Sequence, residues 1–185
     1  DMEIIGKTID DAAGEAFDKI GKIFGLYYPA GPIIDRLAKL GNKDAFQFNK
    51  PRIENYNYSF SGIKTSVLYF IQKEVQKNPD FIVENLNDLC ASVQKTLVEI
   101  LMNKLEKAAK ELNINEVAIA GGVSANSGLR EAMQKNAEKL GWNIYIPKFE
   151  YTTDNAAMIG IVGYQKYLIE NFETSAVVSK ARTTF

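Results

Sequence analysis

The sequence predicts an α/β fold with a large helical share, and three observations lead to that class. Residues from about 81 to 112 carry apolar side chains at helical spacing over a length well beyond an average helix. The last third alternates short apolar strand patterns with helical ones, an order typical of a parallel sheet. Hydrophobic residues make up 46% and charged residues 24% of the 185 residues, which is ordinary for one globular domain.

Composition excludes several kinds of active site. The chain contains no histidine, so it holds no Ser-His pair and no histidine-ligated metal site of its own. A single cysteine, Cys90, excludes an intrachain disulfide, and its place on an apolar helical stripe predicts a small core residue. Low cysteine usage is typical of a reducing, cytoplasmic location. The net charge of −1 gives no overall attraction to nucleic acid or to membranes.

The sequence does not predict a membrane span. The longest apolar run, Ala156–Tyr164, is interrupted by Gly160 and Gly163 and is well short of the roughly 20 residues that a span needs. The chain begins at Asp1 and meets a helical pattern within ten residues. We therefore expect a segment of a longer protein that has no membrane partner.

The first half of the chain predicts two helices and an irregular connection. A capping signal at Thr8–Asp11 precedes apolar residues at helical spacing, and Gly25 is a natural helix stop. The Pro29–Pro32 turn opens a second, short helix that ends at Gly41. Residues 42–60 are rich in aromatic side chains and lack a regular period, so we expect a connection that packs across a surface.

The second half begins with two helices and then alternates in type. Ser61 is expected to cap a helix that runs to about Lys77, and a long helix follows to about Leu112. We then expect a buried strand at 116–120, a helix at about 126–140, a strand at 142–146 and a final helix from near 154. The final helix is apolar all round, which predicts that it is buried. Residues after 170 are weakly patterned and are expected to form a loose tail.

Three carboxylates and a lysine share one face of the first helix. Asp11, Glu15, Asp18 and Lys22 follow one another at helical spacing. A solvated helix face explains this pattern, and so does a carboxylate edge that accepts hydrogen bonds from ribose hydroxyls. Gly14, early in the same helix, costs about 1 kcal/mol relative to alanine, which suggests a close contact there.

Two turns allow both a structural and a binding interpretation. Gly31 either only shapes the Pro29–Pro32 turn or lets the backbone approach a ligand, with Asp35 one helical turn further on. The double glycine at 121–122 leads from an apolar strand into a helix whose start carries Asn126. It is either a plain connection with Ser124 or Asn126 as a cap, or a place where a flat ligand lies on the glycines and a phosphate at the helix N-terminus.

Two further segments stay open in the same way. Asp154 starts the final helix, either as its N-cap or as a hard oxygen ligand for a metal whose other ligands lie outside this chain. The segment Asn57–Thr65 is either aromatic packing with a helix cap, or a nucleic-acid contact through Lys64 and the aromatic rings.

Five segments of the chain form a recognisable series in order and spacing. They are Asp10–Lys19, Tyr28–Pro32, Phe60–Thr65, Gly121–Asn126 followed by Leu129 and Arg130, and Thr153–Met158. Together they resemble the TsaD family of tRNA N6-adenosine threonylcarbamoyltransferases in its bacterial form, over residues 3–168.

The resemblance implies a two-lobed actin-like ATPase (ASKHA) fold, of which this chain is the C-terminal lobe, incomplete without the N-terminal lobe. That lobe would take residues 1–170, with a helical insertion at 42–85, and residues 171–185 would form a tail. The family transfers a threonylcarbamoyl group from threonylcarbamoyl-adenylate to N6 of adenosine 37 in tRNA. TsaB-like and TsaE-like proteins are its expected partners.

Carried over residue by residue, the resemblance assigns substrate binding to Asp18, Gly31, Asp35 and Asn126, and it assigns no catalytic nucleophile or base. Asp154 matches the aspartate that ligates the family's iron or zinc ion. The family's two histidine ligands and its phosphate-contacting glycine loop are missing from this sequence. We therefore expect the isolated chain to be inactive.

Two other functions stay open on the sequence. A non-catalytic actin-like partner of the TsaB type would not be expected to keep Asp18, Asn126 and Asp154 together. The older description of the family as an O-sialoglycoprotein endopeptidase requires a bound metal beside an activating carboxylate, and the sequence shows no such arrangement.

Overall fold

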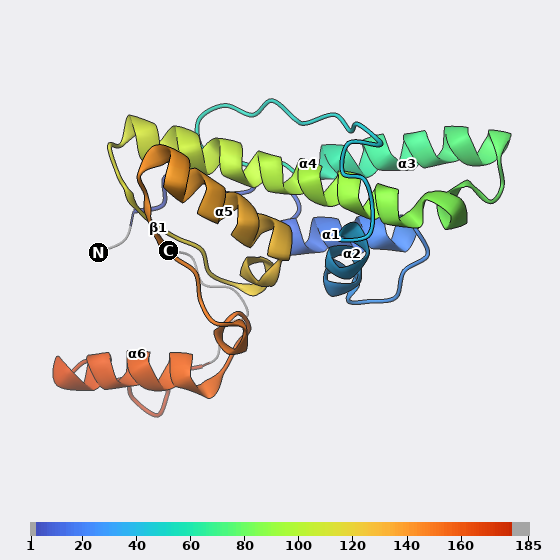
Figure 1. The fold of residues 1–185 in the computed structure, drawn as a ribbon. Coiled ribbons are helices and arrows are strands. Elements are labelled where there is room, and N and C mark those ends of the chain that lie inside the picture. Colours follow the sequence, from blue (N-terminus) through green and yellow to red (C-terminus); the bar gives the residue numbers. More distant parts are fainter. Residues whose placement is uncertain (1–2, 179–185) are drawn as a thin grey trace.

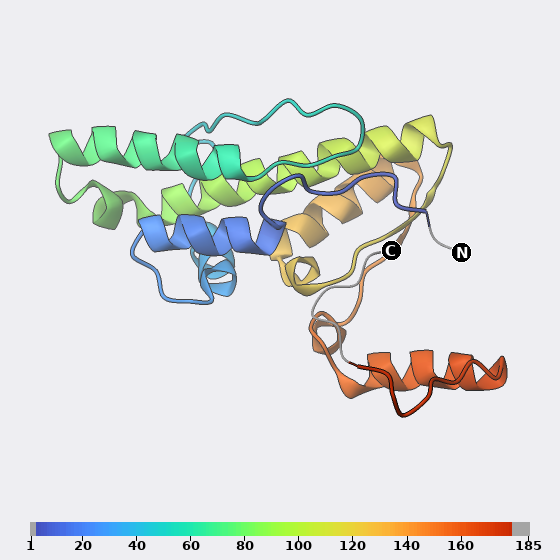
Figure 2. The same cartoon turned by 180° about the vertical axis from the view of Figure 1, so that it is seen from behind.

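The computed structural model of the protein describes residues 3–178, and most of its first half is helical. The helices are α1 (Ala13–Ile23), α2 (Ala30–Ala38), α3 (Ser61–Lys77) and α4 (Phe81–Glu111). The long helix α4 runs through the body, and the other three helices pack around one half of it (Figures 1 and 2). The irregular connection predicted for residues 42–60 is confirmed, because it contains no helix or extended strand.

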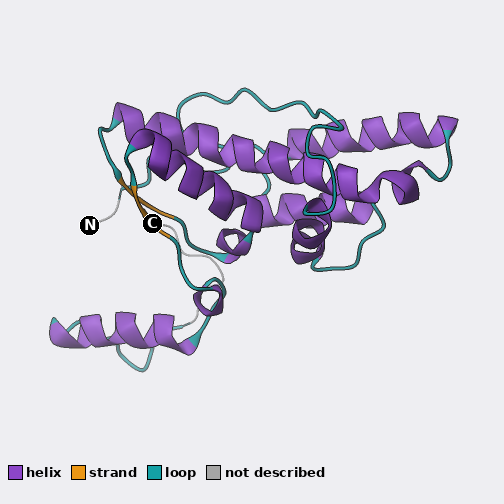
Figure 3. Cartoon of the chain, in the orientation of Figure 1, coloured by secondary structure: helices purple, strands orange, loops and turns teal. Residues whose placement is uncertain are grey.

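The second half contains a small parallel sheet and four further helical elements. They are β1 (Glu116–Ala118), the short 3-10 helix η1 (Gly122–Ala125), α5 (Ser127–Leu140), β2 (Asn143–Tyr145), the 3-10 turn η2 (Phe149–Tyr151) and α6 (Ala156–Leu168). The strands pair in parallel, with Val117 opposite Ile144, and α5 is the connection between them (Figure 3). The predicted helix-rich α/β class is confirmed at this level.

Two apolar clusters hold these elements together. The first lies among α1 to α4 and includes the fully buried side chains of Ile20, Ile34 and Leu97. The second lies between α4, α5 and the sheet, around Met133 and Trp142. Each such side chain contributes about 1.5–3 kcal/mol through burial. The end of η1 and the start of α5 are therefore fixed relative to α4, since α5 packs on that helix.

Cys90 is a core residue, as predicted. Its side chain has no exposed surface and lies in the first apolar cluster. Burial raises the pKa of its thiol to about 12, so the thiolate is negligible near neutral pH. The residue therefore acts as a small hydrophobic side chain.

Glycine positions explain how α1 ends and how it meets α2. Gly25 has φ +78°, and the Leu26 amide donates to the Gly21 carbonyl at 2.9 Å, which ends the helix at the predicted place. A side chain at Gly21 would collide with the Cβ atom of Ala30. The absence of a side chain at Gly21 therefore allows the close approach of α1 and α2.

The predicted helix caps are wrong at two places. At α1, Thr8 Oγ1 donates to the Asp11 carbonyl instead of capping, and the N-cap is Ala12, whose amide donates to Glu15 at 3.4 Å. At α3, Ser61 is the first helical residue rather than the cap. The capping carboxylate comes from Asp10, which lies far away in sequence.

Asp10 receives four hydrogen bonds at the start of α3. The amides of Phe60 and Ser61 donate to Oδ1 at 2.7 and 3.3 Å. The hydroxyls of Ser59 and Ser61 donate to Oδ2 at 2.5 and 2.7 Å. A backbone pairing beside it, in which the Ile9 amide donates to the Tyr58 carbonyl at 2.9 Å, holds the N-terminal segment against α3. One carboxylate thus joins this segment to a helix more than fifty residues on.

The final helix differs from its prediction. α6 was expected to be buried because it is apolar all round, yet none of its residues is buried, and Ile159 is 78% exposed. Figures 1 and 2 show it standing away from the body. No element within residues 3–178 covers it, so its apolar surface needs a cover from elsewhere.

The remaining terminal predictions are met in part. Residues 171–178 of the predicted tail contain no helix or strand, and the rest of the tail lies outside the described residues. Within the part that the structure describes, no helix combines the length and hydropathy needed to cross a membrane.

Replacing Asp10 is expected to destabilise the chain. Partial burial opposes its ionisation, but the hydrogen bonds from Ser59, Phe60 and Ser61 outweigh it and hold the pKa of Asp10 well below its ordinary value. The ionised form therefore adds stability above about pH 4, and this is lost as the pH falls through the folded-state pKa. We expect Asp10→Ala to lower the free energy of unfolding by about 1–2 kcal/mol at pH 7, measured by urea denaturation.

Asp11→Ala is the matched control, because Asp11 is a neighbouring carboxylate that pairs with Lys19 and caps none of the described helices. Its loss should stay below about 1 kcal/mol. Equal losses for the two variants, or an unchanged acid limb in Asp10→Ala, would contradict the capping role.

Candidate functional site

Asp18 joins α1 to the start of α2. Its Oδ1 atom accepts hydrogen bonds from the amides of Ala30 at 2.7 Å and Gly31 at 3.4 Å. The N-cap residue of α2, Pro29, makes no side-chain cap of its own, so Asp18 supplies the missing acceptor. Oδ2 of Asp18 makes no hydrogen bond with the described residues. The carboxylate therefore anchors α2 and still has an acceptor oxygen.

Asp35 joins α2 to the start of α5 in the same manner. Its Oδ1 atom accepts from the amide of Ser127 at 3.0 Å and from the Ser127 hydroxyl at 2.7 Å. Oδ2 lies 3.9 Å from the Lys39 ammonium, a loose ion pair on an exposed lysine. Sequence reasoning missed Ser127, whose only signal was its place directly after a predicted cap.

Asn126 is the N-cap of α5, which confirms the capping interpretation of this residue. Its Oδ1 atom accepts from the Leu129 amide at 3.0 Å, and Nδ2 donates to Gln94 Oε1 at 2.8 Å. The side chain is 9% exposed. Asp35 and Asn126 thus occupy amides at this helix N-terminus, which disfavours the phosphate position that the sequence pattern suggested.

The double glycine before α5 leaves its backbone uncovered. Gly121 has φ +80° and ψ 175°, a conformation open essentially only to glycine. The Ser124 hydroxyl donates to the Gly121 carbonyl at 2.6 Å and fixes the turn. A Cβ atom at Gly121 or Gly122 would meet no described heavy atom within 4 Å. The backbone here is accessible to a ligand.

Gly31 is also open on its side-chain face. A Cβ atom there would lie 3.9 Å from the Cβ atom of Phe17, an ordinary contact distance. Gly14 is similar, because its nearest neighbour would be Val123 Cγ2 at 3.5 Å. The close contact expected at Gly14 is therefore absent among the described residues, and the protein's own packing does not require glycine at Gly31.

The charged face of α1 separates into two parts. Lys19 lies 2.5 Å from Asp11 and 2.9 Å from Glu15. These contacts raise the pKa of Lys19, and its hydrogen bond lowers the pKa of Glu15. Lys19 thus compensates Glu15 within the helix and Asp11, which lies just before it, as in the solvated-face interpretation. Asp18 alone of the three carboxylates hydrogen-bonds another element.

Arg130 stabilises the turn at Gly121–Ala125 through hydrogen bonds, a role that the sequence did not predict. Its Nε atom donates to the Ser124 carbonyl and Nη2 to the Pro147 carbonyl, both at 2.7 Å. The guanidinium group lies 4.0 Å from the ring centroid of Phe149. Arg130 therefore ties η1 to the segment after β2, and its spacing from Asn126 was the only sequence signal.

Asp154 lies apart from these residues. It is exposed in the connection between η2 and α6, and no contact among residues 3–178 joins it to Asp18, Asp35 or Asn126. Its N-cap interpretation is wrong, because Asn155 is the N-cap and accepts from the Met158 amide at 3.1 Å. The described residues contain no group of three metal-ligating side chains.

The segment Asn57–Thr65 follows its packing interpretation. Phe60 is 2% exposed, and its ring stacks on Tyr58 with centroids 5.9 Å apart. The buried Phe60 ring is unavailable for stacking on a base. Lys64 is only partly exposed, so the proposed nucleic-acid contact has little support.

Gly121→Ala is expected to destabilise the chain by about 1–3 kcal/mol, because alanine does not adopt the Gly121 conformation without strain. Gly122→Ala is the control, since a Cβ atom there also meets open space but φ lies outside the left-handed region. Urea unfolding of both variants measures the difference. Equal stabilities would contradict the strained-turn account.

The chain as a whole is similar to one family of known proteins. The family described as "TsaD: tRNA N6-adenosine threonylcarbamoyltransferase" matches residues 1–161. A protein of Riemerella anatipestifer named tRNA N6-adenosine threonylcarbamoyltransferase is 70% identical over 182 residues, which cover 98% of this chain and 53% of that protein. A Phocaeicola vulgatus protein of the same name is 61% identical over 184 residues, which cover 100% and 54%.

The chain therefore spans about half the length of these relatives. With most of its residues matched in one family and high identity throughout, the chain belongs to the TsaD family of tRNA N6-adenosine threonylcarbamoyltransferases.

Proposed function

We propose that the full-length protein transfers a threonylcarbamoyl group from threonylcarbamoyl-adenylate to N6 of adenosine 37 in tRNA, and that this chain supplies part of the adenylate site. The observation that carries the proposal is a continuous series of contacts. Asp18 binds the start of α2 at Gly31, α2 carries Asp35, and Asp35 binds Ser127 beside Asn126. The four matched substrate positions thus lie on elements that contact one another directly.

The carboxylate chemistry suits a ribose. Asp18 uses Oδ1 on backbone amides, and its Oδ2 keeps the capacity to accept hydrogen bonds from a diol. Asp35 uses its Oδ1 atom on Ser127 in the same way. Because each carboxylate is held by two donors, its second oxygen is presented with little conformational freedom, and only that of Asp35 is loosely paired, with Lys39. That preorganisation favours a ligand of fixed shape.

The glycines suit the planar and polar parts of the adenylate. Gly31, Gly121 and Gly122 have no side chain and no close protein neighbour. A base or acyl group could then lie directly on the peptide backbone. Phosphate is expected away from the start of α5, where the Asp35 carboxylate lies.

In the proposed reaction the N6 amine of adenosine attacks the carbamoyl carbon of threonylcarbamoyl-adenylate. The new C–N bond forms as the bond from that carbon to the phosphate oxygen breaks, AMP leaves with the electron pair, and the N6 nitrogen loses a proton. The described residues offer neither a histidine base nor an activated nucleophile. Their contribution is therefore binding and orientation of the adenylate.

The family implies an iron or zinc ion, and Asp154 is the residue that would ligate it. An exposed carboxylate with no described partner is a suitable hard ligand. One carboxylate does not hold such an ion alone, so the remaining ligands must come from outside the described residues. When bound, the metal would polarise the carbamoyl carbonyl and neutralise charge on the leaving phosphate.

The exposed apolar surface of α6 supports a second lobe in the full-length protein. We place this chain as the C-terminal lobe of an actin-like (ASKHA) fold, over residues 1–170 with a helical insertion at 42–85. The apolar side chains of α6, including Ile159 and Leu168, supply a surface for the N-terminal lobe. tRNA, TsaB-like and TsaE-like proteins are the proposed partners, and the cytoplasm the proposed location.

Gly31→Ala tests the adenylate site with little disturbance of the fold. The new Cβ atom has room in the protein, so stability should be unchanged or slightly higher. A ligand that lies on this backbone would lose contact, and we expect the Kd for AMP in the full-length protein to rise about tenfold. Isothermal titration calorimetry measures both variants.

The control is Gly62→Ala, at the equivalent second position of α3 and also in open space. It should bind AMP as the wild type does. An unchanged Kd for Gly31→Ala would contradict the placement of the adenylate.

Asp154→Ala is expected to remove the metal from the full-length protein and to lower transfer to tRNA by at least about tenfold. Elemental analysis and quantification of the modified nucleoside measure the two effects. The control is Glu150→Ala, an exposed carboxylate four residues earlier. Unchanged metal content and modification in Asp154→Ala would favour the non-catalytic, TsaB-type alternative.

A further inference from the structure

Gln94 is a buried polar residue of α4 that meets the start of α5. Its side chain is 7% exposed, and its Oε1 atom accepts the hydrogen bond from Asn126 Nδ2 at 2.8 Å. A Cβ atom at Gly128 would lie 2.8 Å from Gln94 Nε2, so the glutamine packs directly against the first turn of α5. The contact joins α4 to α5 through Gln94. The sequence pattern predicted only that this residue lies on the long helix.

Two neighbours fix the orientation of the Asn126 side-chain amide, that is, which side carries Oδ1 and which carries Nδ2. The Leu129 amide must donate to an oxygen, which requires Oδ1 on that side and Nδ2 on the other. Nδ2 then needs an acceptor in a buried place, and Gln94 Oε1 provides it. An unpaired buried donor costs about 1–3 kcal/mol. The hydrogen bond to Gln94 therefore favours one rotation of the Asn126 amide group over the others.

One donor and one acceptor of Asn126 remain after these two hydrogen bonds. The amide nitrogen carries two hydrogens and the oxygen two lone pairs, and each uses one on the protein. We propose that Gln94 is a positioning residue that holds the Asn126 amide so that its second N–H and second lone pair meet the adenylate; this rests on the proposed adenylate-binding role of Asn126.

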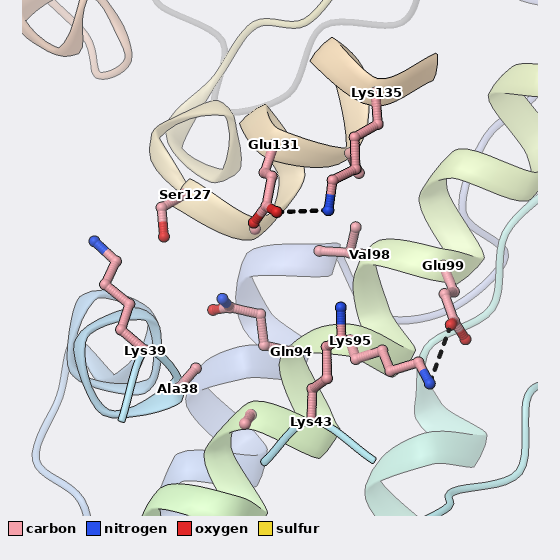
Figure 4. Close-up of a pocket in the computed structure, with 13 residues that line it drawn as sticks. Ala38, Lys39, Lys43, Gln94, Lys95, Val98, Glu99, Ser127, Glu131 and Lys135 are labelled. Atoms are coloured by element: carbon pink, nitrogen blue, oxygen red, sulfur yellow. Dashed lines mark hydrogen bonds and ion pairs between the residues drawn. The ribbon is translucent and has the colours of Figure 1, made fainter. Parts of the chain in front are cut away.

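The surroundings of Gln94 indicate which substitution keeps this role. Figure 4 shows Gln94 reaching from α4 toward the side of a pocket where Ser127 and Lys39 lie. Lys43 and Lys95 also line this pocket. A glutamate at this position would still accept from Asn126 Nδ2. Lys43 and the N-terminus of α5 would offset part of its charge, while Lys39 and Lys95 already pair with carboxylates. A leucine would fill similar volume without an acceptor.

The experiment uses the full-length protein and AMP as the probe. We expect Gln94→Leu to raise the Kd for AMP about tenfold through the lost anchor, and Gln94→Glu to stay within about twofold of the wild type. KM for threonylcarbamoyl-adenylate should rise in Gln94→Leu while kcat changes little, because the residue acts on binding.

Thr96→Val is the matched control on the same helix. Thr96 is 5% exposed and donates to the Ser92 carbonyl at 2.8 Å, so the variant loses a buried hydrogen bond without touching Asn126. Its Tm should fall while its Kd for AMP stays at the wild-type value. A Kd raised equally in Gln94→Leu, Gln94→Glu and Thr96→Val would overturn the proposal in favour of general destabilisation.

Asn126→Asp separates this inference from the proposed function. The aspartate keeps the cap on Leu129 but replaces Nδ2 by an acceptor. A raised Kd in Asn126→Asp with a wild-type Kd in Gln94→Leu would overturn the positioning role alone. A wild-type Kd in Asn126→Asp would instead overturn the adenylate role of Asn126.

Discussion

The candidate site depends on one arrangement, in which helix α2 is held between α1 and α5 by two carboxylates. Asp18 binds the amides at the start of α2, and Asp35, on α2, binds Ser127 at the start of α5. Charge-assisted hydrogen bonds of this kind are about twice as strong as neutral ones. The consecutive helices α1 and α2 are thereby fixed relative to α5, which lies far away in sequence, and Gly31 and Asn126 take their places from this arrangement.

Packing on α4 makes this arrangement rigid. The first apolar cluster fixes α1 and α2 against α4, and the second fixes α5 against the other half of the same helix. Gln94 bridges α4 and the cap of α5 at the level of the site. The turn at Gly121 is held by the hydrogen bonds of Ser124 and Arg130 and by the packing of Val123 against both apolar clusters. The uncovered backbone is thus supported by buried elements, as a binding surface requires.

Local patterns predicted the helices well, and the failures involve interactions across the chain. The bounds of α3 and the glycine stop of α1 follow from short-range chemistry. The cap of α3 comes from Asp10, more than fifty residues away, which no local signal reveals. Capping by Asn126 was one of the open interpretations of its turn and is confirmed, but its partner Gln94 depends on the packing of α4 on α5. The apolar pattern of α6 predicted that the helix is buried, but a sequence pattern does not identify the surface that would cover it.

A crystal structure of the full-length protein with bound AMP tests the central claim most directly, namely that the carboxylates holding α2 also hold the ligand. We expect a ribose hydroxyl within about 3.2 Å of Asp18 Oδ2, with the ligand lying on the backbone of Gly31 and Gly121. AMP bound elsewhere, with Oδ2 of Asp18 left to solvent, would contradict it.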